Sequence, residues 1–263
     1  MAAAIERSGL SGSISIQRFN IVRGAEAREC LKRGDAKLFY PKSGLDRRPI
    51  IAVPDSRRII VPNLVIDLAQ IEWIKRWRFL SGSARTIKTV AVGSGYVDPL
   101  PSDTDLEIPL DSDDIDSWDD ALITPDSTGK SITIGQKLWL SSQANGTLSE
   151  IGLQFDDATL VTHALFKKLS ITGATNANPV RITTSIAHGL ATGDEVHINS
   201  VGGMTEINDM DFTITVFDAD ELDLDGEDGT SHGTYTSGGF AFLQVIKSAA
   251  KVVQTDYRLE FTS

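Results

Sequence analysis

The sequence predicts a mainly β protein with one helix, and three observations carry this prediction. Short runs of β-branched and aromatic residues recur along the chain, separated by Gly, Pro and Asp, as strands are separated by turns. One stretch, residues 62–82, instead spaces its apolar positions by three and four, which is typical of an amphipathic helix. Between residues 172 and 242 the strands become shorter and the glycine turns more frequent, which favours a small barrel or sandwich.

Composition narrows the classes of protein to consider. The chain has 263 residues, of which 41% are hydrophobic, so it can bury the cores of one large or two modest domains. It has no run of about eighteen apolar residues, and its first residues lack the basic and apolar parts of a leader. We therefore expect no membrane insertion and no secretory signal. Cys30 is the single cysteine, which excludes an internal disulfide framework.

Charge is distributed unevenly along the chain. Residues 1–80 contain 15 Lys and Arg against 8 Asp and Glu, a net charge of +7, whereas residues 81–263 contain 10 against 28, a net charge of −18. A basic N-terminal region is expected to meet a negative surface, either nucleic acid or an acidic protein. The arginines are spread out and do not alternate with aromatic residues, so nucleic acid is not the expected partner. A basic face that is simply solvated is the alternative.

The elements follow in order along the chain. Residues 14–60 mix short apolar runs with charged residues and predict strands and extended segments. A helix follows, for which Asn63 is the candidate N-cap and Gly82 marks the end. Residues 85–110 predict a strand, a glycine turn and a Pro- and Asp-rich segment, and the acidic run 111–120 predicts an exposed loop.

The second half of the chain predicts two kinds of β structure. Residues 130–172 predict an antiparallel sheet, with a tight hairpin at 156–158 and, from Leu160 to Phe166, a strand with one buried and one wetter face. The last stretch, residues 245–263, has the pattern of this sheet again and ends in a final strand. Between them, short strands are predicted at residues 179–184, 195–200, 212–219, 221–225 and 239–243.

The sequence contains partial matches to motifs for catalysis and cofactor binding, but required residues are missing at the required positions. The segment TPDSTGKS ends like a phosphate-binding loop, but the first glycine of that motif would fall at Thr124, and a strand follows where a helix is needed. A nucleophile elbow around Ser94 would need glycine in place of Val92. Cys30 has no histidine near it in sequence. We therefore predict no catalytic residue, no cofactor-binding residue and no enzymatic activity.

Two groups of residues could bind a metal ion, and for both a structural role is favoured. His188, Asp194 and His197 lie close in sequence, but a zinc site needs ordered second-shell partners, and turn or surface positions account for both histidines. The acidic run from Asp218 to Asp228 departs from the pattern of a calcium-binding loop, which favours an acidic strand that runs into a turn. We therefore predict no metal ligands, with calcium at the acidic run as the alternative.

Residues 172–242 contain an ordered series of motifs: PVRITTSIAHGL, TGDEV, GGMTEIN and YTSGG. With this series the segment resembles the small β module first named from ubiquitin-activating enzymes, the FCCH-like domain, which recurs in bacteriophage structural proteins. The resemblance implies an accessory domain on the surface of a particle. Nothing else in the chain resembles a ubiquitin-activating enzyme.

The flanks of this module contain three further motifs: NLVIDLAQIEWIKRWRFLSG, IKTVAVGSGYVDPLPSDTDLEIPL and the hairpin strand SEIGLQF. With these the flanks are similar to a bacteriophage tail-fibre or collar family. In that family a lysine-led final strand soon follows the hairpin, and here VIKSAAKVVQTDYRLEF provides it after the small module. Tyr96 and Val97 stand where that family has small polar residues.

The two resemblances together imply one β domain interrupted by another. Residues 61–171 and 243–263 are expected to form an antiparallel β-sandwich host domain with one helix. Residues 172–242 are expected to form an inserted small β-barrel-like domain, and residues 1–60 a basic N-terminal arm. The candidate docking residues of this arm are Arg47, Arg48, Arg57 and Arg58.

The function implied is that of a structural component of a phage virion, in the neck, collar or tail fibre, that is assembled in the host cytoplasm. Its expected partners are other virion proteins near the neck, tail or portal, and further copies of the chain in a trimer or ring. The first alternative is a receptor-binding fibre protein that recognises a host cell-surface glycan. A second alternative, a glycan hydrolase, would need two carboxylates at a set separation. The sequence contains so many acidic residues that such a pair can always be nominated, so their presence does not support this alternative.

Overall fold

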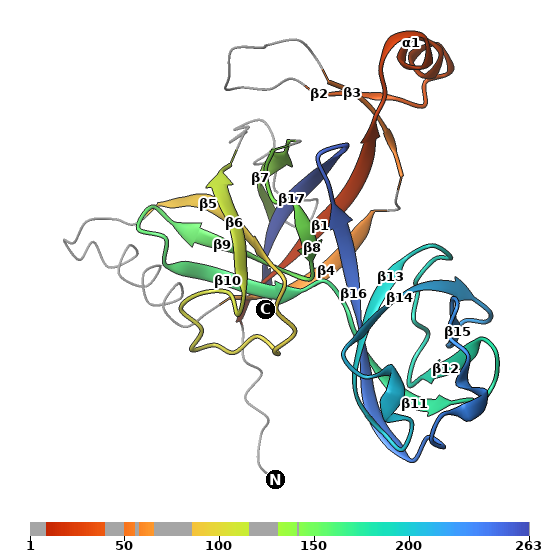
Figure 1. Ribbon diagram of the computed structural model, residues 1–263. Helices are drawn as coiled ribbons and strands as arrows, with labels where there is room; N and C mark the ends of the chain where they lie inside the picture. Colours follow the sequence, from red (N-terminus) through yellow and green to blue (C-terminus); the bar gives the residue numbers. More distant parts are fainter. Residues whose placement is uncertain are drawn as a thin grey trace. The chain divides into compact units, whose positions relative to one another are not determined.

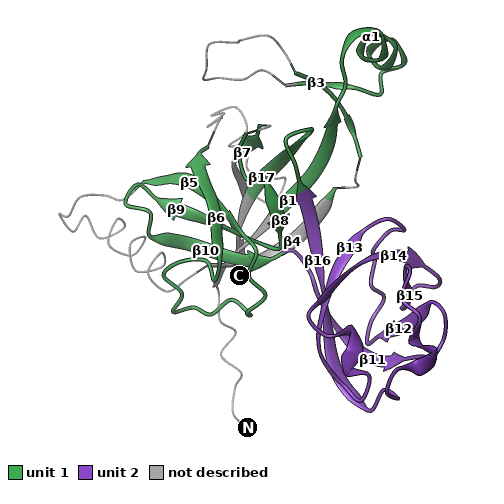
Figure 2. Cartoon of the chain, viewed as in Figure 1, with its two compact units in different colours: residues 1–165, 247–263 green, residues 166–246 purple. Residues whose placement is uncertain are grey.

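The computed structural model of the chain describes residues 9–39, 50–55, 58–65, 86–115, 131–140 and 142–262. The described chain is mainly β with one α-helix, as the sequence predicts (Figure 1). It divides into two compact units, of which unit 1 comprises residues 1–165 and 247–263 and unit 2 comprises residues 166–246 (Figure 2). No helix of the described residues is long and apolar enough to cross a membrane.

Unit 1 is built on a curled antiparallel sheet. Its described strands follow the order β2-β3-β1-β4-β10-β9-β5-β6, and β17 adds to β1 and pairs with β7 on its other edge. The strands of unit 1 are β1 (Gly9–Ile21), β2 (Lys37–Phe39), β3 (Ile50–Pro54), β4 (Ile59–Val65), β5 (Ile87–Gly93), β6 (Pro109–Asp114), β7 (Ser131–Trp139), β8 (Gly146–Leu148), β9 (Glu150–Phe155), β10 (Leu160–Leu165) and β17 (Lys251–Thr262).

The N-terminal segment is part of this sheet. β1 pairs with β17 along its length, from Gly9 opposite Thr262 to Asn20 opposite Lys251, and its other edge pairs with β3 and β4. Ile16 and Phe19 of β1 are both buried, and their odd spacing places them on opposite faces, as expected for a strand in the interior of a sheet. The described residues 9–39 therefore differ from the separate arm expected for residues 1–60.

The helix of the structure is not the predicted one. α1 (Gly24–Arg33) ends at Gly34, whose left-handed backbone lets its N–H reach the carbonyl of Leu31. It buries Ala27 and Cys30 and is otherwise exposed, so its apolar stripe is too narrow to stand out in the sequence.

The predicted start of the helix at Asn63 is wrong. Residues up to Val65 belong to β4, where Asn63 pairs with Gly12 of β1 and Leu64 with His163 of β10. Both edges of β4 form backbone pairs, and this pairing stabilises a strand despite the helical spacing of the apolar residues. The rest of the predicted helix, up to Gly82, lies outside the described residues.

Two further expectations for unit 1 are corrected. The acidic run predicted as a loop begins as the strand β6, which pairs with β5. Asp113 of this strand accepts a hydrogen bond from Lys137 (2.8 Å), and Asp111 accepts one from the Ala144 N–H (2.7 Å). Residues 116–120 of that run lie outside the described residues. β10 buries both of its faces rather than one. Its polar Thr162 can be buried because it accepts a hydrogen bond from the Leu153 N–H (3.0 Å).

Lys247 anchors the last part of unit 1. It is the lysine that leads the predicted final strand, and its side chain is almost fully buried. Its ammonium donates hydrogen bonds to the carbonyl oxygens of Leu140 (2.9 Å) and Ser248 (3.1 Å) and to Oδ1 of Asn145 (3.1 Å). Burial lowers the pKa of Lys247 to about 8. Its three acceptors tie the end of β16 to the turn that follows β7.

Unit 2 is a closed barrel of six strands. Neighbouring strands follow the order β11-β12-β15-β14-β13-β16, and β16 pairs again with β11 to close the circle. Each predicted strand of the glycine-rich region is confirmed, and alternate residues fill the barrel with apolar side chains. The strands are β11 (Lys168–Ala174), β12 (Val180–Thr184), β13 (Glu195–Gly202), β14 (Met210–Val216), β15 (Glu221–Leu224) and β16 (Ser237–Lys247).

The chain enters and leaves the barrel on paired strands. Lys168 of β11 lies opposite Phe242 of β16, and the Leu243 N–H donates a hydrogen bond to the carbonyl of Lys167 (2.9 Å). The expected boundaries at residues 172 and 242 fall inside these two strands, whereas unit 2 runs from Phe166 to Ile246. Two chain ends held side by side are the geometry that insertion into a host domain requires.

Gly203 permits a close backbone contact within the barrel, and this contact gives a testable prediction. Its φ is +85°, and a Cβ atom there would lie 2.0 Å from the carbonyl oxygen of Thr234. Gly226 has a similar φ of +82° but open space around it. Gly203→Ala should therefore lower the free energy of unfolding by about 1–3 kcal/mol more than Gly226→Ala, as measured by denaturant unfolding. Equal losses for the two variants would contradict this account.

Candidate functional site

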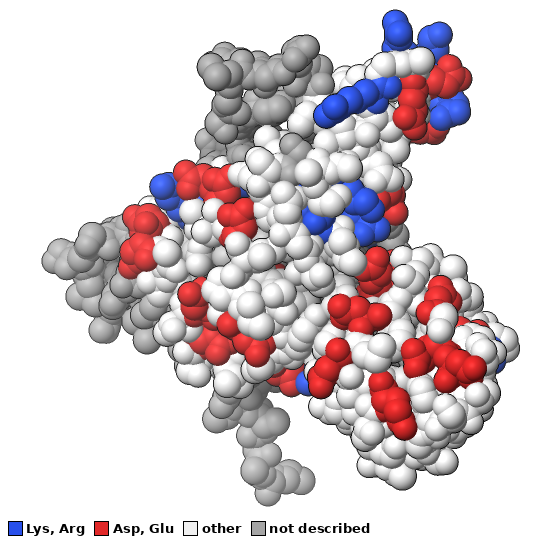
Figure 3. Space-filling view, in the orientation of Figure 1, with Lys and Arg blue, Asp and Glu red and all other residues white. Residues whose placement is uncertain are grey.

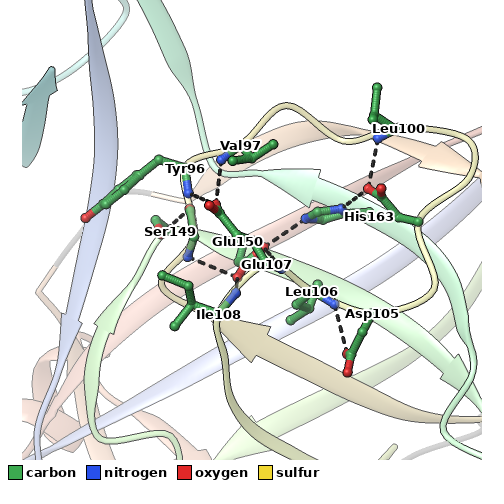
Figure 4. A network of polar contacts seen from close by, with 12 residues as sticks. Tyr96, Val97, Leu100, Asp105, Leu106, Glu107, Ile108, Ser149, Glu150 and His163 are labelled. Carbon is green, nitrogen blue, oxygen red and sulfur yellow. Dashed lines mark hydrogen bonds and ion pairs between the residues drawn. The ribbon is translucent and has the colours of Figure 1, made fainter. Parts of the chain in front are cut away.

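The candidate site is a buried carboxylate beneath the segment that joins β5 to β6 (Figure 4). Glu150, at the start of β9, is fully buried. Its Oε1 accepts hydrogen bonds from the backbone N–H groups of Gly95 (3.0 Å) and Ile108 (2.8 Å). Its Oε2 accepts from the N–H of Glu107 (3.0 Å) and from Nε2 of His163 (2.9 Å). One side chain thus holds both ends of the segment 94–108.

His163 lies between two carboxylates. It is on β10, the strand next to β9, with Nδ1 2.7 Å from Oδ2 of Asp103 and Nε2 2.9 Å from Oε2 of Glu150. Because both neighbours are acceptors when ionised, both ring nitrogens donate and the ring is an imidazolium. Burial disfavours this charged ring, but the hydrogen bonds to Glu150 and Asp103 outweigh burial and raise the pKa of His163.

The same contacts lower the pKa of the Glu150 carboxyl group, whereas they raise that of His163. Burial alone would raise the pKa of Glu150, but the hydrogen bonds from His163 and from three backbone N–H groups stabilise the anion. The pKa of Glu150 is therefore lowered. Each partner thus favours the charged form of the other, and the further hydrogen bonds of the Glu150 carboxylate come from backbone N–H groups.

Further contacts fix the middle of the segment. Glu107 accepts hydrogen bonds from the N–H groups of Tyr96 (2.6 Å) and Val97 (2.7 Å). Ser149 donates through Oγ to the carbonyl of Gly95 (2.7 Å). A side chain at position 95 would not fit, because a Cβ atom there would lie 2.6 Å from Glu107 and 2.7 Å from Glu150. The name carboxylate clamp is used below for Asp103, Glu107, Ser149, Glu150 and His163.

The chemistry of the clamp is structural. A histidine that serves as general base needs one ring nitrogen for its substrate, and both nitrogens of His163 are taken by carboxylates. The hydroxyl of Ser149 donates to a backbone carbonyl and not to a base. The clamp can, however, hold the outer side of the segment in one conformation. Four exposed apolar side chains occupy that side and its continuation into β6: Val97, Leu100, Ile108 and Leu110.

Of the candidate docking residues, the structure describes Arg58. Arg58 forms an ion pair with Asp256 of β17, and half of its side chain is exposed. Arg47, Arg48 and Arg57 lie outside the described residues.

Each of the candidate zinc ligands has structural partners within unit 2. His188 donates through Nε2 to the carbonyl of Asp218 (2.7 Å) and accepts through Nδ1 from the Leu190 N–H (2.8 Å), so it stabilises a turn. His197 contacts Asp211 (2.8 Å), and Asp194 accepts from the backbone of its own turn. Among the residues that the structure describes, no group of three or more His, Cys, Asp and Glu could hold a metal ion.

The acidic run of unit 2 has structural partners as well. Asp223 forms an ion pair with Arg181 (2.6 Å) across β12 and β15. Asp228 accepts a hydrogen bond from the Thr230 N–H (3.1 Å), which caps the short helix η2 (Gly229–Ser231).

Sequence reasoning missed the clamp. Glu150 belongs to the SEIGLQF motif and Asp103 to the Pro- and Asp-rich segment, yet neither was singled out. A signal was present, because Glu150 and His163 are charged or polar positions within strands that are otherwise apolar. In the hairpin register His163 lies opposite Gly152, two residues from Glu150, so the two side chains are diagonal neighbours and a buried pair could have been proposed.

Comparison with known proteins identifies part of unit 2. Residues 175–245 match the family model described as the ubiquitin-activating enzyme E1 FCCH domain. This confirms the resemblance of the small β module, and the matched residues all lie within the barrel unit. No curated protein matches the chain in sequence. The similarity of unit 1 to a phage family stays a prediction.

The clamp predicts how stability depends on pH. The pKa of His163 is raised in the folded state, so its contribution is complete below the unfolded-state pKa of 6.5 and is lost as pH rises through the folded-state pKa. The pKa of Glu150 is lowered, so its contribution is present above 4.5 and is lost as pH falls through the folded-state pKa. The clamp is therefore fully effective between these limits.

His163→Gln tests this pH dependence. The variant should lose about 3 kcal/mol of unfolding free energy near pH 6, because it leaves the buried Glu150 without its cation. The difference from wild type should shrink as pH rises, since wild type then loses the imidazolium too. Denaturant unfolding of both proteins from pH 5.5 to 9 measures this, with His197→Gln as the control. A difference that stays constant with pH would contradict the assignment of an imidazolium.

Proposed function

We propose that the chain is a structural component of a bacteriophage virion, located in the neck, collar or tail fibre. In this proposal unit 1 attaches to other virion proteins and unit 2 is displayed as an accessory module. The observation that carries the proposal is the closed FCCH-like barrel whose chain ends leave on the paired strands β11 and β16. A module with its own apolar core and adjacent ends can be carried by a host domain without disturbing its sheet.

The chemistry of unit 1 supports a structural role over an enzymatic one. Its buried polar groups hold chain segments: the clamp fixes the segment 94–108, and Lys247 fixes three acceptors around the start of the final strand. The side chains of the clamp with catalytic potential, His163 and Ser149, are occupied by partners within the protein. The proposed role is therefore structural and not catalytic. In this proposal the protein is assembled into the virion in the host cytoplasm.

One observation favours a second candidate, a fibre protein whose barrel recognises a host cell-surface glycan. Phe217 of unit 2 is more than half exposed, and the guanidinium of Arg181 lies 3.2 Å from the centre of its ring. The acidic residues Asp218 and Asp220 follow it directly in sequence. An aromatic ring beside carboxylates is a combination that can stack on a sugar ring and accept hydrogen bonds from its hydroxyl groups.

Deletion of unit 2 tests the inserted arrangement. Replacing residues 167–246 with a short glycine linker should leave unit 1 folded, because the deletion removes the whole barrel and joins neighbouring chain ends. The matched control removes residues 174–240, which leaves parts of β11 and β16 without their barrel partners and should give a less stable product. Near-ultraviolet circular dichroism and thermal unfolding measure both. A molten product from the first deletion would contradict the arrangement.

Particles that carry the deletion of 167–246 test the function itself. We expect them to assemble, to contain unit 1 at the neck, collar or tail fibre in electron micrographs, and to lack density for one surface module. Normal adsorption to host cells would favour the structural role, whereas loss of adsorption would favour the glycan-binding candidate. Particles that do not contain the full-length chain would overturn the proposed function.

A further inference from the structure

We infer that copies of the chain associate head to tail, with the tip formed by α1 and β2 of one copy seated on the clamped segment of the next. The inference rests on the proposed function and takes up the trimer or ring expected from the sequence, because it names the two surfaces that meet. Two names are used for them. The acidic surface comprises residues 94–114, and the basic tip comprises residues 23–39.

The acidic surface combines exposed apolar side chains with negative charge. Val97, Leu100, Ile108 and Leu110 are between 43% and 54% exposed. The same residues 94–114 contain six Asp and one Glu and no Lys or Arg, a net charge of −7. Exposed apolar groups surrounded by polar residues are typical of a protein-binding site.

The clamp prepares this surface for binding. Its carboxylates fix the backbone at Gly95, Tyr96, Val97 and Ile108, so the apolar side chains project from a segment that is already ordered. A surface that is rigid before binding loses less conformational entropy when a partner arrives. This gives the buried ion pair of His163 and Glu150 a role beyond stability.

The basic tip has the complementary chemistry. Leu31 and Leu38 are 38% and 43% exposed. The tip carries five basic residues against three acidic ones, a net charge of +2. Figure 3 shows both blue and red atoms over α1, whereas the surface over the segment 94–108 is white and red. β2 also ends the described strand order, so one of its edges pairs with no described strand.

The two surfaces account for the exposed apolar residues of unit 1. Of its described residues, six large apolar side chains are exposed, and all six lie on the acidic surface or on the basic tip: Leu31, Leu38, Val97, Leu100, Ile108 and Leu110. Because all are exposed within one chain, the two surfaces do not cover each other there. A second copy offers each surface a partner of opposite charge with apolar groups to bury.

A contact between two different surfaces has a geometric consequence. Each copy keeps one free tip and one free acidic surface after the first contact, so association continues until the copies close a ring. If the rotation that relates one copy to the next does not close a ring, the copies form a filament instead. The same contact cannot produce a closed dimer unless both surfaces engage at once.

Two variants of the purified full-length chain test the inference. Asp105→Lys reverses charge on the acidic surface, and Lys32→Glu reverses charge on the basic tip. Each should weaken self-association by at least about tenfold, measured by sedimentation velocity over a range of concentrations, because like charges then face each other. Asp156→Lys, at an exposed turn of unit 1 outside both surfaces, is the matched control and should associate like wild type.

Mixing the two variants gives the sharper result. The intact tip of Asp105→Lys can bind the intact acidic surface of Lys32→Glu, and the two exchanged charges are again opposite in sign, so the mixture should associate more strongly than either variant alone. Leu100→Ser should weaken association without changing charge, with Ile186→Ser as its control. Thermal unfolding checks that each variant is folded.

Three outcomes would overturn the inference: a wild-type chain that stays monomeric at high concentration, an Asp105→Lys variant that associates as strongly as Asp156→Lys, or a mixture that stays monomeric. These results concern the purified chain alone. A chain that associates through these surfaces but is missing from particles would overturn the proposed function and leave the association intact.

Discussion

The buried carboxylate of Glu150 is the interaction on which the shape of unit 1 depends. A charged group without partners in the protein interior is strongly unfavourable, so this side chain is tolerated because three backbone N–H groups and an imidazolium surround it. Two of those N–H groups, at Gly95 and Ile108, come from the two ends of a long connection. The need to solvate one anion thereby helps to decide the path of this segment, together with the contacts of Glu107 and Ser149.

The two units are stabilised in different ways. The barrel of unit 2 is filled with apolar side chains on alternating positions and needs no charged group in its interior. Unit 1 instead buries Lys137, Glu150, His163 and Lys247, each with specific acceptors or donors. Apolar packing tolerates exchange of side chains of similar volume, whereas a buried polar network specifies one arrangement of its neighbours. Unit 2 is therefore the more tolerant of the two to sequence change.

The elements marked by local sequence patterns could be predicted, whereas those that depend on contacts between distant residues could not. The strands of the barrel were predicted because Gly turns and alternation mark them, and its motifs matched a family. The start of the predicted helix at Asn63 was wrong because pairing with Gly12 and with β10 overrides local spacing, and such pairing is not visible in the sequence. α1 was missed because it buries two residues. The clamp was missed because its members come from three separate segments that meet in the folded chain.

The pairing of β1 with β17 sets the order in which the chain can fold. Gly9 lies opposite Thr262, so the central ladder of unit 1 closes the longest loop that the described chain contains, and its entropic cost is met late. The barrel consists of residues 166–246, all of which precede β17 in the chain, so it can close before β17 is made. During synthesis β1 therefore waits with one edge unpaired, which is the state in which a strand is open to wrong partners. Pairing with β17 ends this exposure.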